Sequence, residues 1–219
     1  MKGRASEQMF ITLEGIEGCG KTTQINLLRT FFENRGQPCV VTREPGGTAI
    51  GKEIRSILLN PSSKDLVPKA ELLLYMADRA QHITTLVKPC LAENKVVLCD
   101  RYFDATVVYQ GCARGLDTRF ICELHRLVLE DFKPDITLLL DLSPRIGLAR
   151  AWKQLNSGAR SGSESRFEEE TLDFHEKVRA GYLERAGLEP ERFRIIDASG
   201  DEKQVQRDIR EALTEFLGE

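Results

Sequence analysis

Five short apolar runs recur along the chain, and a longer amphipathic stretch follows each of them. The runs occupy residues 9–15, 39–43, 96–100, 136–142 and 193–198. Four of them are almost continuously apolar over about five residues, a pattern typical of strands that are covered on both faces in a parallel sheet. We therefore predict five strands that belong to one parallel sheet.

The stretches between the runs carry the period of about 3.6 residues that is typical of amphipathic helices. Helices are predicted over residues 21–34, 47–59, 68–94, 104–112, 118–131, 143–152, 168–186 and 203–217. Gly36 is expected to cap the first helix and Pro89 to kink the third. Ser143 and Pro144 are expected to begin the sixth. The alternation predicts an α/β fold with helices flanking the sheet, built as a single domain over residues 1–219.

Two segments depart from this alternation. Residues 156–170, "NSGARSGSESRFEEE", are rich in Ser, Gly and Arg and have no apolar period before Phe167. Because they lie between two predicted helices, we expect a mobile surface loop that acts as a lid. Residues 1–8 carry no extended apolar run and are expected to be disordered.

The charges of the chain are nearly balanced, with 31 Lys and Arg against 34 Asp and Glu. This balance argues against binding to nucleic acid or to a membrane surface through bulk charge. The six cysteines include no CxxC pair and only three histidines are present, so a zinc site is disfavoured and free thiols are expected. With no leading apolar segment and no apolar run of about 18 residues, the sequence predicts a soluble, cytoplasmic protein.

The stretch "GIEGCGKTT", residues 15–23, joins the first predicted strand to the first helix. It matches the phosphate-binding pattern G-x-x-x-x-G-K-[ST] at Gly15, Gly20, Lys21 and Thr22. The glycines let successive N–H groups point at a phosphate, and the helix N-terminus adds a partial positive charge. We expect Lys21 to reach the β- and γ-phosphates of a nucleotide and the Thr22 hydroxyl to bind Mg²⁺.

A phosphate-binding loop by itself does not define a reaction, because GTPases, motor ATPases and small-molecule kinases share it. The chain has no NKxD motif for reading guanine, and no apolar run that ends in Asp-Glu to supply a water-activating glutamate. Hydrolysis is therefore less favoured than transfer to a second substrate.

Three further clusters are typical of an acceptor site near the carboxyl ends of the strands. The first is "TREPGGT", residues 42–48, which follows the second predicted strand. The second places Tyr75 and Arg79 four residues apart on one helix face, where the ring can stack on a base and the arginine can bind its edge. An ordinary exposed helix face is the alternative interpretation of this pair.

The third cluster, "VVLCDRYFDATVVYQG", begins in the third predicted strand. Asp100 is placed to act as an outer-shell carboxylate for Mg²⁺, and Arg101 to bridge two phosphates, with a structural Asp–Arg pair as the alternative. Asp141 also ends an apolar strand. Because "DLSPR" is explained by a strand that leads into a capped helix, Asp141 is not predicted as a metal ligand.

Together these motifs make the chain resemble thymidylate kinase, a P-loop family that phosphorylates dTMP to dTDP with ATP. The resemblance covers nearly the whole chain and is carried by "LEGIEGCGKTTQ", "TREPGGT", "GKEIRSILL", "LLLYMADRAQH", "CDRYFDATVVYQG", "ITLLLDL" and "SRFEEE…FHEKVRAGYLE". Many families share the P-loop, whereas "REPGGT" together with "DRY…YQG" is far more specific. The resemblance implies a three-layer P-loop NTPase-type fold, ATP and Mg²⁺ as cofactors, and a homodimer.

The resemblance also implies roles for individual residues of this chain. The ATP site would contain Gly15, Ile16, Glu17, Gly18, Cys19, Gly20, Lys21, Thr22, Thr23 and Arg150. The dTMP site would contain Glu44, Pro45, Arg55, Tyr75, Arg79, Arg101, Thr106, Tyr109 and Gln110. In this second set, Arg55 and Arg101 match arginines that hold the dTMP phosphate. Tyr75 matches an aromatic that stacks on thymine, Arg79 an arginine that reads its edge, and Tyr109 a tyrosine that disfavours a 2′-hydroxyl.

Members of the family divide by whether a catalytic arginine lies in the P-loop or in the lid. Here the P-loop reads "IEGCG" without an arginine, while the lid carries Arg160 and Arg166, so the chain is similar to the bacterial-type group. A lid arginine stabilises charge on the transferred phosphoryl group, and a closed lid excludes water. The predicted catalytic residues are therefore Lys21, Arg101, Glu17, Arg160 and Arg166. A solvated basic loop is the alternative interpretation of the two lid arginines.

Two features depart from the family pattern. Ala105 stands where the family often has Ser, so a hydroxyl that would touch the acceptor phosphate or Arg101 is missing. The lid is also longer than the common pattern, which leaves open which arginine reaches ATP.

The sequence thus predicts a kinase that transfers the γ-phosphoryl group of Mg·ATP to dTMP. The acceptor phosphate is already ionised, so no strong general base is required. A kinase for another nucleotide or nucleoside is one alternative, and a nucleotide-binding ATPase switch is another. The second cluster of arginines and aromatics argues against the switch, which has no evident use for it.

Overall fold

The computed structural model describes residues 8–157 and 164–218. All five predicted strands are present: β1 Met9–Glu14, β2 Cys39–Arg43, β3 Val96–Asp100, β4 Ile136–Asp141 and β5 Phe193–Asp197. The expectations for residues 1–7 and for residues 158–163, which include Arg160, lie outside the described residues.

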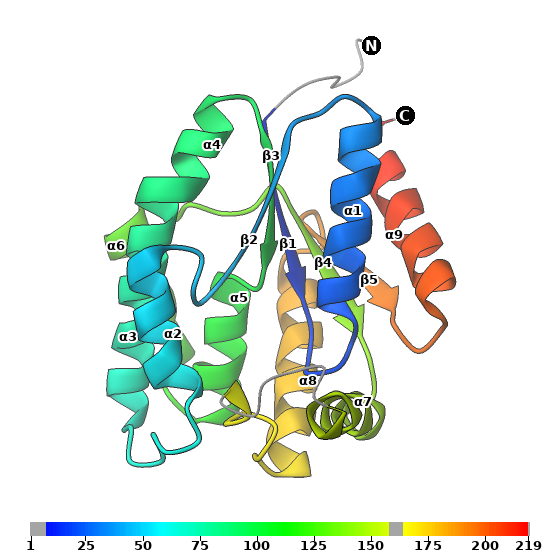
Figure 1. Cartoon of the computed structure of the whole chain (residues 1–219). Coiled ribbons are helices and arrows are strands. Elements are labelled where there is room, and N and C mark those ends of the chain that lie inside the picture. Colours follow the sequence, from blue (N-terminus) through cyan, green and yellow to red (C-terminus); the bar gives the residue numbers. More distant parts are fainter. Residues whose placement is uncertain (1–7, 158–163, 219) are drawn as a thin grey trace.

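The five strands form one parallel sheet in the order β2-β3-β1-β4-β5. The first strand is the central one, and it pairs with β3 on one side and with β4 on the other. All five carboxyl ends therefore lie along one edge of the sheet, the lower edge in Figure 1. The predicted α/β fold with a five-stranded parallel sheet is confirmed.

The three inner strands are buried almost throughout, as their continuous apolar runs predict. Successive side chains enter hydrophobic clusters on opposite faces of the sheet. Phe10 and Val97 belong to one cluster, and their neighbours Ile11 and Leu98 belong to the other. The edge strands β2 and β5 are partly exposed, because each has a neighbouring strand on one side only.

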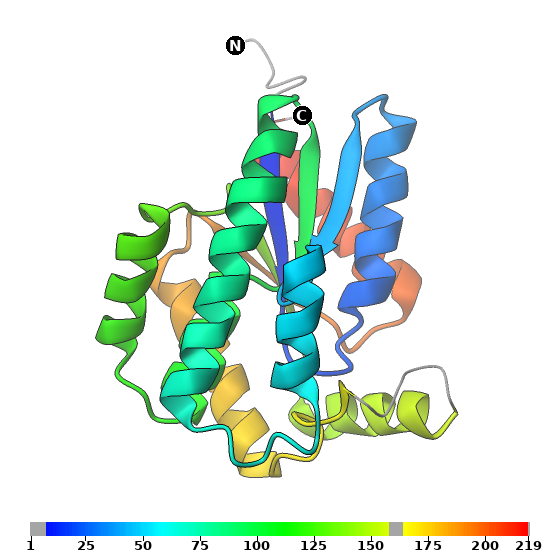
Figure 2. The same ribbon diagram turned by 60° about the vertical axis from the view of Figure 1, so that its left-hand side comes forward.

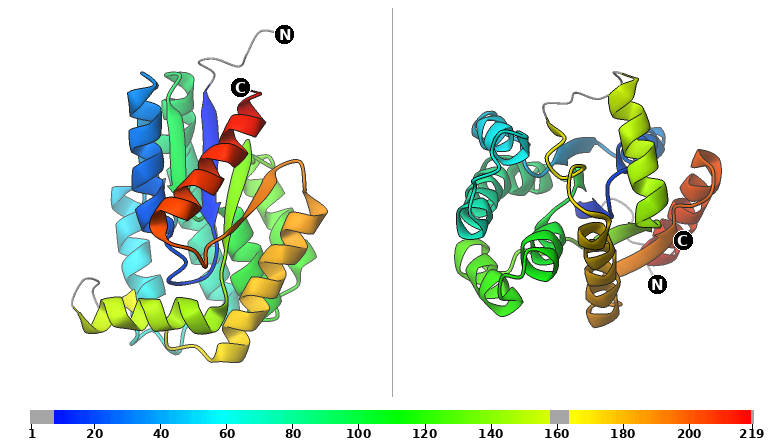
Figure 3. Two further views of the ribbon diagram at one scale, coloured as in Figure 1. Left: turned by 90° about the vertical axis from the view of Figure 1, so that its right-hand side faces the viewer. Right: turned by 90° about the horizontal axis from the view of Figure 1, so that it is seen from below.

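Helices cover both faces of the sheet. Their bounds are α1 Lys21–Asn34, α2 Ala49–Leu59, α3 Pro68–His82, α4 Lys88–Ala92, α5 Phe103–Thr106, α6 Thr118–Leu129, α7 Pro144–Asn156, α8 Leu172–Leu188 and α9 Glu202–Leu217. Helices α1 and α9 pack together on one face, as the left view of Figure 3 shows. Helices α3 to α6 and α8 lie on the other face, with α2 against α3 (Figure 2). Helix α7 crosses the carboxyl edge (Figure 3).

Capping side chains explain where two helices begin. Helix α2 starts two residues later than predicted, because the Thr48 hydroxyl accepts a hydrogen bond from the Gly51 N–H. Helix α8 starts at Leu172 and not at residue 168, because Thr171 caps it in the same way. Ser143 precedes α7 as predicted, but its side chain makes no capping hydrogen bond.

Two of the predicted helices contain π-helical segments. The helix predicted over residues 68–94 is divided by the segment η1, Ile83–Val87, just before Pro89. Proline has no N–H to continue the regular hydrogen-bond ladder, so the irregularity lies where the kink was predicted. The segment η2, Val107–Ala113, follows α5 and carries Tyr109 and Gln110.

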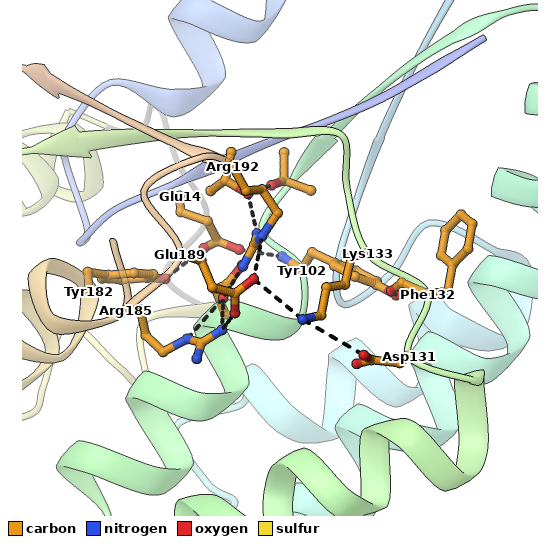
Figure 4. A network of polar contacts seen from close by, with 12 residues as sticks. Glu14, Tyr102, Asp131, Phe132, Lys133, Tyr182, Arg185, Glu189 and Arg192 are labelled. Carbon is orange, nitrogen blue, oxygen red and sulfur yellow. Dashed lines mark hydrogen bonds and ion pairs between the residues drawn. The ribbon is translucent and has the colours of Figure 1, made fainter. Parts of the chain in front are cut away.

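A buried carboxyl group lies at the end of the central strand, as Figure 4 shows. Glu14 is fully buried, and its oxygens accept hydrogen bonds from the Tyr102 N–H and the Tyr182 hydroxyl, both at 2.7 Å. Burial, reinforced by the nearby charge of Asp104, raises the pKa of Glu14 to about 7, although Arg101 favours the charged form.

Asp104 is also buried, and two arginines neutralise it. Arg192 donates to it at 2.7 Å and Arg185 at 3.2 Å, and both arginines contact Glu189 (Figure 4). Lys133 extends this ion-pair network to the connection between α6 and β4. The network ties α5 and α8 to the segments that lead into β4 and β5.

Glu14 is predicted to make the stability of the protein fall as the pH rises. Its pKa is raised from 4.5 to about 7 on folding, so its favourable contribution is complete below pH 4.5 and is lost as the pH passes 7. Relative to Glu14→Gln, the wild-type free energy of unfolding should decrease by on the order of 3 kcal/mol across this range.

Urea unfolding at a series of pH values measures this difference. Glu211→Gln, at an exposed position on α9, is the control for the loss of one charge. Parallel pH curves for the wild type and Glu14→Gln would contradict the prediction.

Candidate functional site

A cavity of about 480 Å³ is formed by the segments that follow the carboxyl ends of β1, β2 and β3. Most of the predicted site residues line it: Glu17, Gly18, Gly20, Lys21, Thr22, Thr23, Glu44, Pro45, Arg55, Tyr75, Arg79, Asp100, Arg101, Thr106, Tyr109 and Gln110. Among the described residues, the predicted positions that do not line it are Gly15, Ile16, Cys19, Arg150 and Arg166. Donor and acceptor candidates from distant parts of the sequence are thus brought into one space.

The P-loop has the backbone conformation that its glycines were expected to permit. Gly15, Gly18 and Gly20 have φ of 137°, 69° and 100°, a region that residues with a side chain rarely adopt. A Cβ on Gly18 would also lie 2.0 Å from the carbonyl oxygen of Gly147, so α7 packs directly against the loop. Lys21 is buried, and its Nζ donates to the carbonyl oxygens of Gly15 and of residue 16 at 2.9 and 2.8 Å.

Glu17 and Arg101 form an ion pair inside the cavity. Arg101 follows β3 with a positive φ of 68°, and its Nη2 donates to Oε1 of Glu17 at 2.8 Å. The Tyr109 hydroxyl donates to the same oxygen at 2.6 Å, and the Arg101 guanidinium lies over the Tyr109 ring. Burial alone would raise the pKa of Glu17, but the charge of Arg101 holds it well below its ordinary value. The Glu17 carboxylate is therefore ionised.

A second buried carboxylate, Glu44, holds Arg79. Nε of Arg79 donates to Oε2 of Glu44 at 2.6 Å, and Nη2 donates to the Thr106 hydroxyl at 2.9 Å. Oε1 of Glu44 lies 2.8 Å from Nδ1 of His82, whose Nε2 lies 2.7 Å from the Thr42 hydroxyl. Arg79 is only 1% exposed, so the alternative of an ordinary exposed helix face is wrong for it.

Asp100 and Thr22 line the cavity together. Oδ1 of Asp100 is buried and makes no hydrogen bond to any described residue, which suits an oxygen that would face a hydrated cation. No cluster of three or more His, Cys, Asp or Glu side chains suited to a metal ion occurs within residues 8–157 and 164–218. Asp141 forms a two-pronged ion pair with Arg179, at 2.7 and 2.8 Å.

The residues after the undescribed part of the lid pack against the acceptor side of the cavity. Glu164 receives two hydrogen bonds from Arg55, at 2.9 and 2.8 Å. Arg166 is 8% exposed, pairs with the fully buried Glu71 at 2.7 Å and donates to the carbonyl oxygen of Leu58. Arg166 is therefore held away from the cavity in this structure.

Glu71 has a further partner that faces the site. Its Oε1 accepts a hydrogen bond of 2.8 Å from the Gln110 amide, which also lines the cavity. Tyr75, one helical turn after Glu71, lines the cavity as well. Arg150, by contrast, donates to the carbonyl oxygens of Ala198 and Ser199 in the connection between β5 and α9.

Several residues that shape the site were missed by sequence reasoning. Glu71, His82, Glu164, Phe167 and His175 contact or line it, although none belongs to a phosphate-binding pattern. The motifs quoted for the resemblance do contain His82, Phe167 and His175, in "RAQH", "SRFEEE" and "FHEKV", but they assigned these residues no role. Their partners come from other elements, and no local spacing reveals them.

Comparison with known proteins agrees with this geometry. The family model described as thymidylate kinase matches residues 13–209. A thymidylate kinase from Desulfosudis oleivorans is 56% identical over 197 residues, which cover 90% of this chain and 92% of that protein. The chain belongs to the thymidylate kinase family.

A second sequence comparison and a structure comparison support membership in the thymidylate kinase family. A thymidylate kinase from Geotalea uraniireducens is 50% identical over 210 residues, covering 96% of this chain and 98% of that protein. A crystal structure of thymidylate kinase from Ehrlichia chaffeensis superposes with a TM-score of 0.74 at 33% identity, over 94% of this chain and 99% of that one. Family membership confirms the predicted dTMP kinase activity, dTMP to dTDP, and the use of ATP.

Two predictions about the whole chain can be compared with the structure. All six cysteines are free thiols, as expected. In the part of the chain that the structure describes, no helix has the length and apolar character that crossing a membrane requires.

Arg166 is predicted to stabilise the fold through Glu71. Replacing Arg166 with Met should lower the free energy of unfolding by about 3 kcal/mol, because the buried carboxylate loses its closest ion-pair partner. Urea unfolding measures the change, with Arg119→Met at an exposed position on α6 as the control. Unchanged stability together with a large loss of turnover would contradict this role and favour Arg166 as a catalytic lid arginine.

Proposed function

We propose that the residues lining the cavity position ATP and dTMP for direct transfer of the γ-phosphoryl group. The observation that carries this assignment is that Lys21 and Thr22 of the P-loop share one cavity with Arg79, Arg101 and Tyr109. Transfer between two bound phosphates requires both substrates in one water-poor space. A hydrolytic nucleotide switch has no need of the second group of side chains.

On the donor side, the P-loop N–H groups and Lys21 are proposed to bind the β- and γ-phosphates. Thr22 is proposed to bind Mg²⁺ directly and Asp100 through water, which fits the unpartnered Oδ1 of Asp100. When bound, the ion neutralises charge between the phosphates. Arg150 is proposed to contact ATP outside the cavity, beside the connection between β5 and α9.

On the acceptor side, Arg55 and Arg101 are proposed to hold the phosphate of dTMP. Each is oriented by a carboxylate in this structure, Arg55 by Glu164 and Arg101 by Glu17. Tyr75 is proposed to stack on thymine, and Arg79 to bind the edge of the base. The remaining acceptor residues are proposed to contact base and sugar: Glu44, Pro45, Thr106, Tyr109 and Gln110.

The transfer itself needs no general base, because the attacking phosphate oxygen is already ionised. Lys21 and Arg101 are proposed to neutralise charge that spreads over the transferred group, with one lid arginine completing the set. The ion pair between Arg166 and Glu71 favours Arg160 for that role on the basis of the sequence. Residues 156–170 remain proposed as a lid within a single domain.

The protein is proposed to be cytoplasmic. Its free cysteines are consistent with that location.

Acceptor selectivity tests this function. In a coupled ADP-release assay with Mg·ATP, dTMP should be turned over in preference to UMP, CMP, AMP and thymidine, with dUMP as the nearest competitor. Lys21→Ala and Arg101→Ala should each lower kcat/KM by about 100-fold or more, because each removes charge stabilisation of the transferred group.

Lys177→Ala, at an exposed position on α8, is the control for loss of a cation. Preference for an acceptor other than dTMP or dUMP would refute the assignment. ATP loss that is indifferent to dTMP would favour the hydrolytic switch.

We also propose that the protein is a homodimer joined through α2, α3 and α6. These helices lie next to one another on one side of the molecule, as Figure 2 shows. They expose large apolar side chains: Ile50, Ile57, Leu73, Phe120, Leu127 and Val128. Apolar side chains gathered on neighbouring helices are typical of an interface between subunits.

Leu73→Glu is predicted to dissociate this dimer. Leu73 is 57% exposed on α3, and a buried charge at an interface without a partner is strongly unfavourable. Sedimentation equilibrium should give twice the 24.7 kDa chain mass for the wild type and the single-chain mass for the variant. Leu188→Glu, 66% exposed at the end of α8, should remain dimeric. A monomeric wild type would refute the proposal.

A further inference from the structure

His175 on α8 is fully buried and connects two segments that line the cavity. Its Nδ1 lies 3.2 Å from Oε2 of Glu17, in the P-loop. Its Nε2 lies 3.0 Å from the carbonyl oxygen of Phe167, in the segment that precedes α8. Neither contact was expected from the sequence, and the roles proposed above do not require this side chain.

Both polar neighbours of the imidazole ring can only accept hydrogen bonds. Glu17 is an ionised carboxylate, and the Phe167 oxygen is a backbone carbonyl. In either neutral tautomer, the ring nitrogen without a proton would lie about 3 Å from one of these oxygens, and two electron-rich atoms at that distance repel each other. Only the imidazolium ion, which carries a proton on each nitrogen, is attracted to both neighbours.

Nδ1 and Oε2 lie at an ion-pair distance of 3.2 Å. Within the described residues, neither atom makes an aligned hydrogen bond, so a protonated ring would attract the carboxylate through its charge and not through a directed hydrogen bond. The other charged or titratable groups around Glu17 are Arg101, Tyr109 and Lys21. Arg101 and Tyr109 bind Oε1, whereas His175 faces Oε2.

We propose that His175 is a positioning residue that acts as an imidazolium ion. It holds Oε2 of Glu17 and thereby fixes the orientation of the carboxylate. In this orientation, Oε1 accepts the hydrogen bonds from Arg101 and Tyr109. It also ties Phe167, which lines the cavity, to the P-loop. This inference rests on the proposed function, because the group that is finally positioned is the Arg101 guanidinium that holds the dTMP phosphate.

The protonation state can be read directly from the whole protein labelled with ¹⁵N-histidine. The chain has three histidines, so His175→Gln assigns the signal. At neutral pH both ring nitrogens of His175 should give the chemical shift of a protonated nitrogen, and Glu17→Gln should return the ring to a neutral tautomer. A neutral His175 in the wild type would overturn the inference, whether or not the variants fold.

Kinetics separate positioning from a purely structural role. His175→Gln keeps a donor for the Phe167 carbonyl but removes the charge, so the KM for dTMP should rise about tenfold while the KM for ATP changes less than about twofold. In the Glu17→Gln background, the same substitution should change the KM for dTMP by less than about twofold, because the carboxylate it acts through is gone.

His125→Gln supplies the matched control. His125 is also fully buried, but it stacks on Phe103 and has no contact with Glu17. Its replacement should leave the KM for dTMP unchanged. Additive effects of His175→Gln and Glu17→Gln would overturn the positioning role. If His175 is an imidazolium ion but the protein does not phosphorylate dTMP, both the proposed function and the positioning role are refuted. If the protein is an active dTMP kinase but the His175 ring is neutral, this inference alone is refuted.

Discussion

The arrangement of the site depends on the ion pair between the buried Glu17 and the partly buried Arg101. Glu17 lies in the loop after β1, and Arg101 directly follows β3. The parallel pairing of these two strands brings their carboxyl ends together, so the P-loop and the acceptor arginine meet at one point of the sheet. A buried charge is costly without a partner, so each side chain restricts where the other can lie. The cavity for donor and acceptor forms around this contact.

The same physical solution recurs around the cavity. Glu44 holds Arg79, and Glu71 holds Arg166, each pair at 2.6 to 2.7 Å and almost fully buried. Arginine side chains are long and flexible, and fixing them before the substrate arrives reduces the entropy lost on binding. Glu17 and Glu44 thus fix two arginines that line the cavity, whereas Glu71 fixes Arg166 outside it. This explains why a site for two anionic substrates contains acidic residues.

Much of the fold could be predicted from local pattern. The three inner strands are covered on both faces, and that burial requires the continuous apolar runs that marked them in the sequence. The P-loop was equally visible, because a fixed backbone path requires Gly15 and Gly20 at set distances from Lys21. Helix starts were less accurate, since the caps at Thr48 and Thr171 compete with nearby alternatives of similar free energy.

The sequence by itself determined the strands, the phosphate loop and the family, because these depend on residues close together in the chain. Only the tertiary structure decided which carboxylate holds which arginine, that Arg166 is buried against Glu71, and that His175 faces Glu17. These contacts join residues up to 158 positions apart, the separation of His175 from Glu17. Packing of α8 and the segment before it against the P-loop sets such pairs, and neither periodicity nor spacing along the chain encodes them.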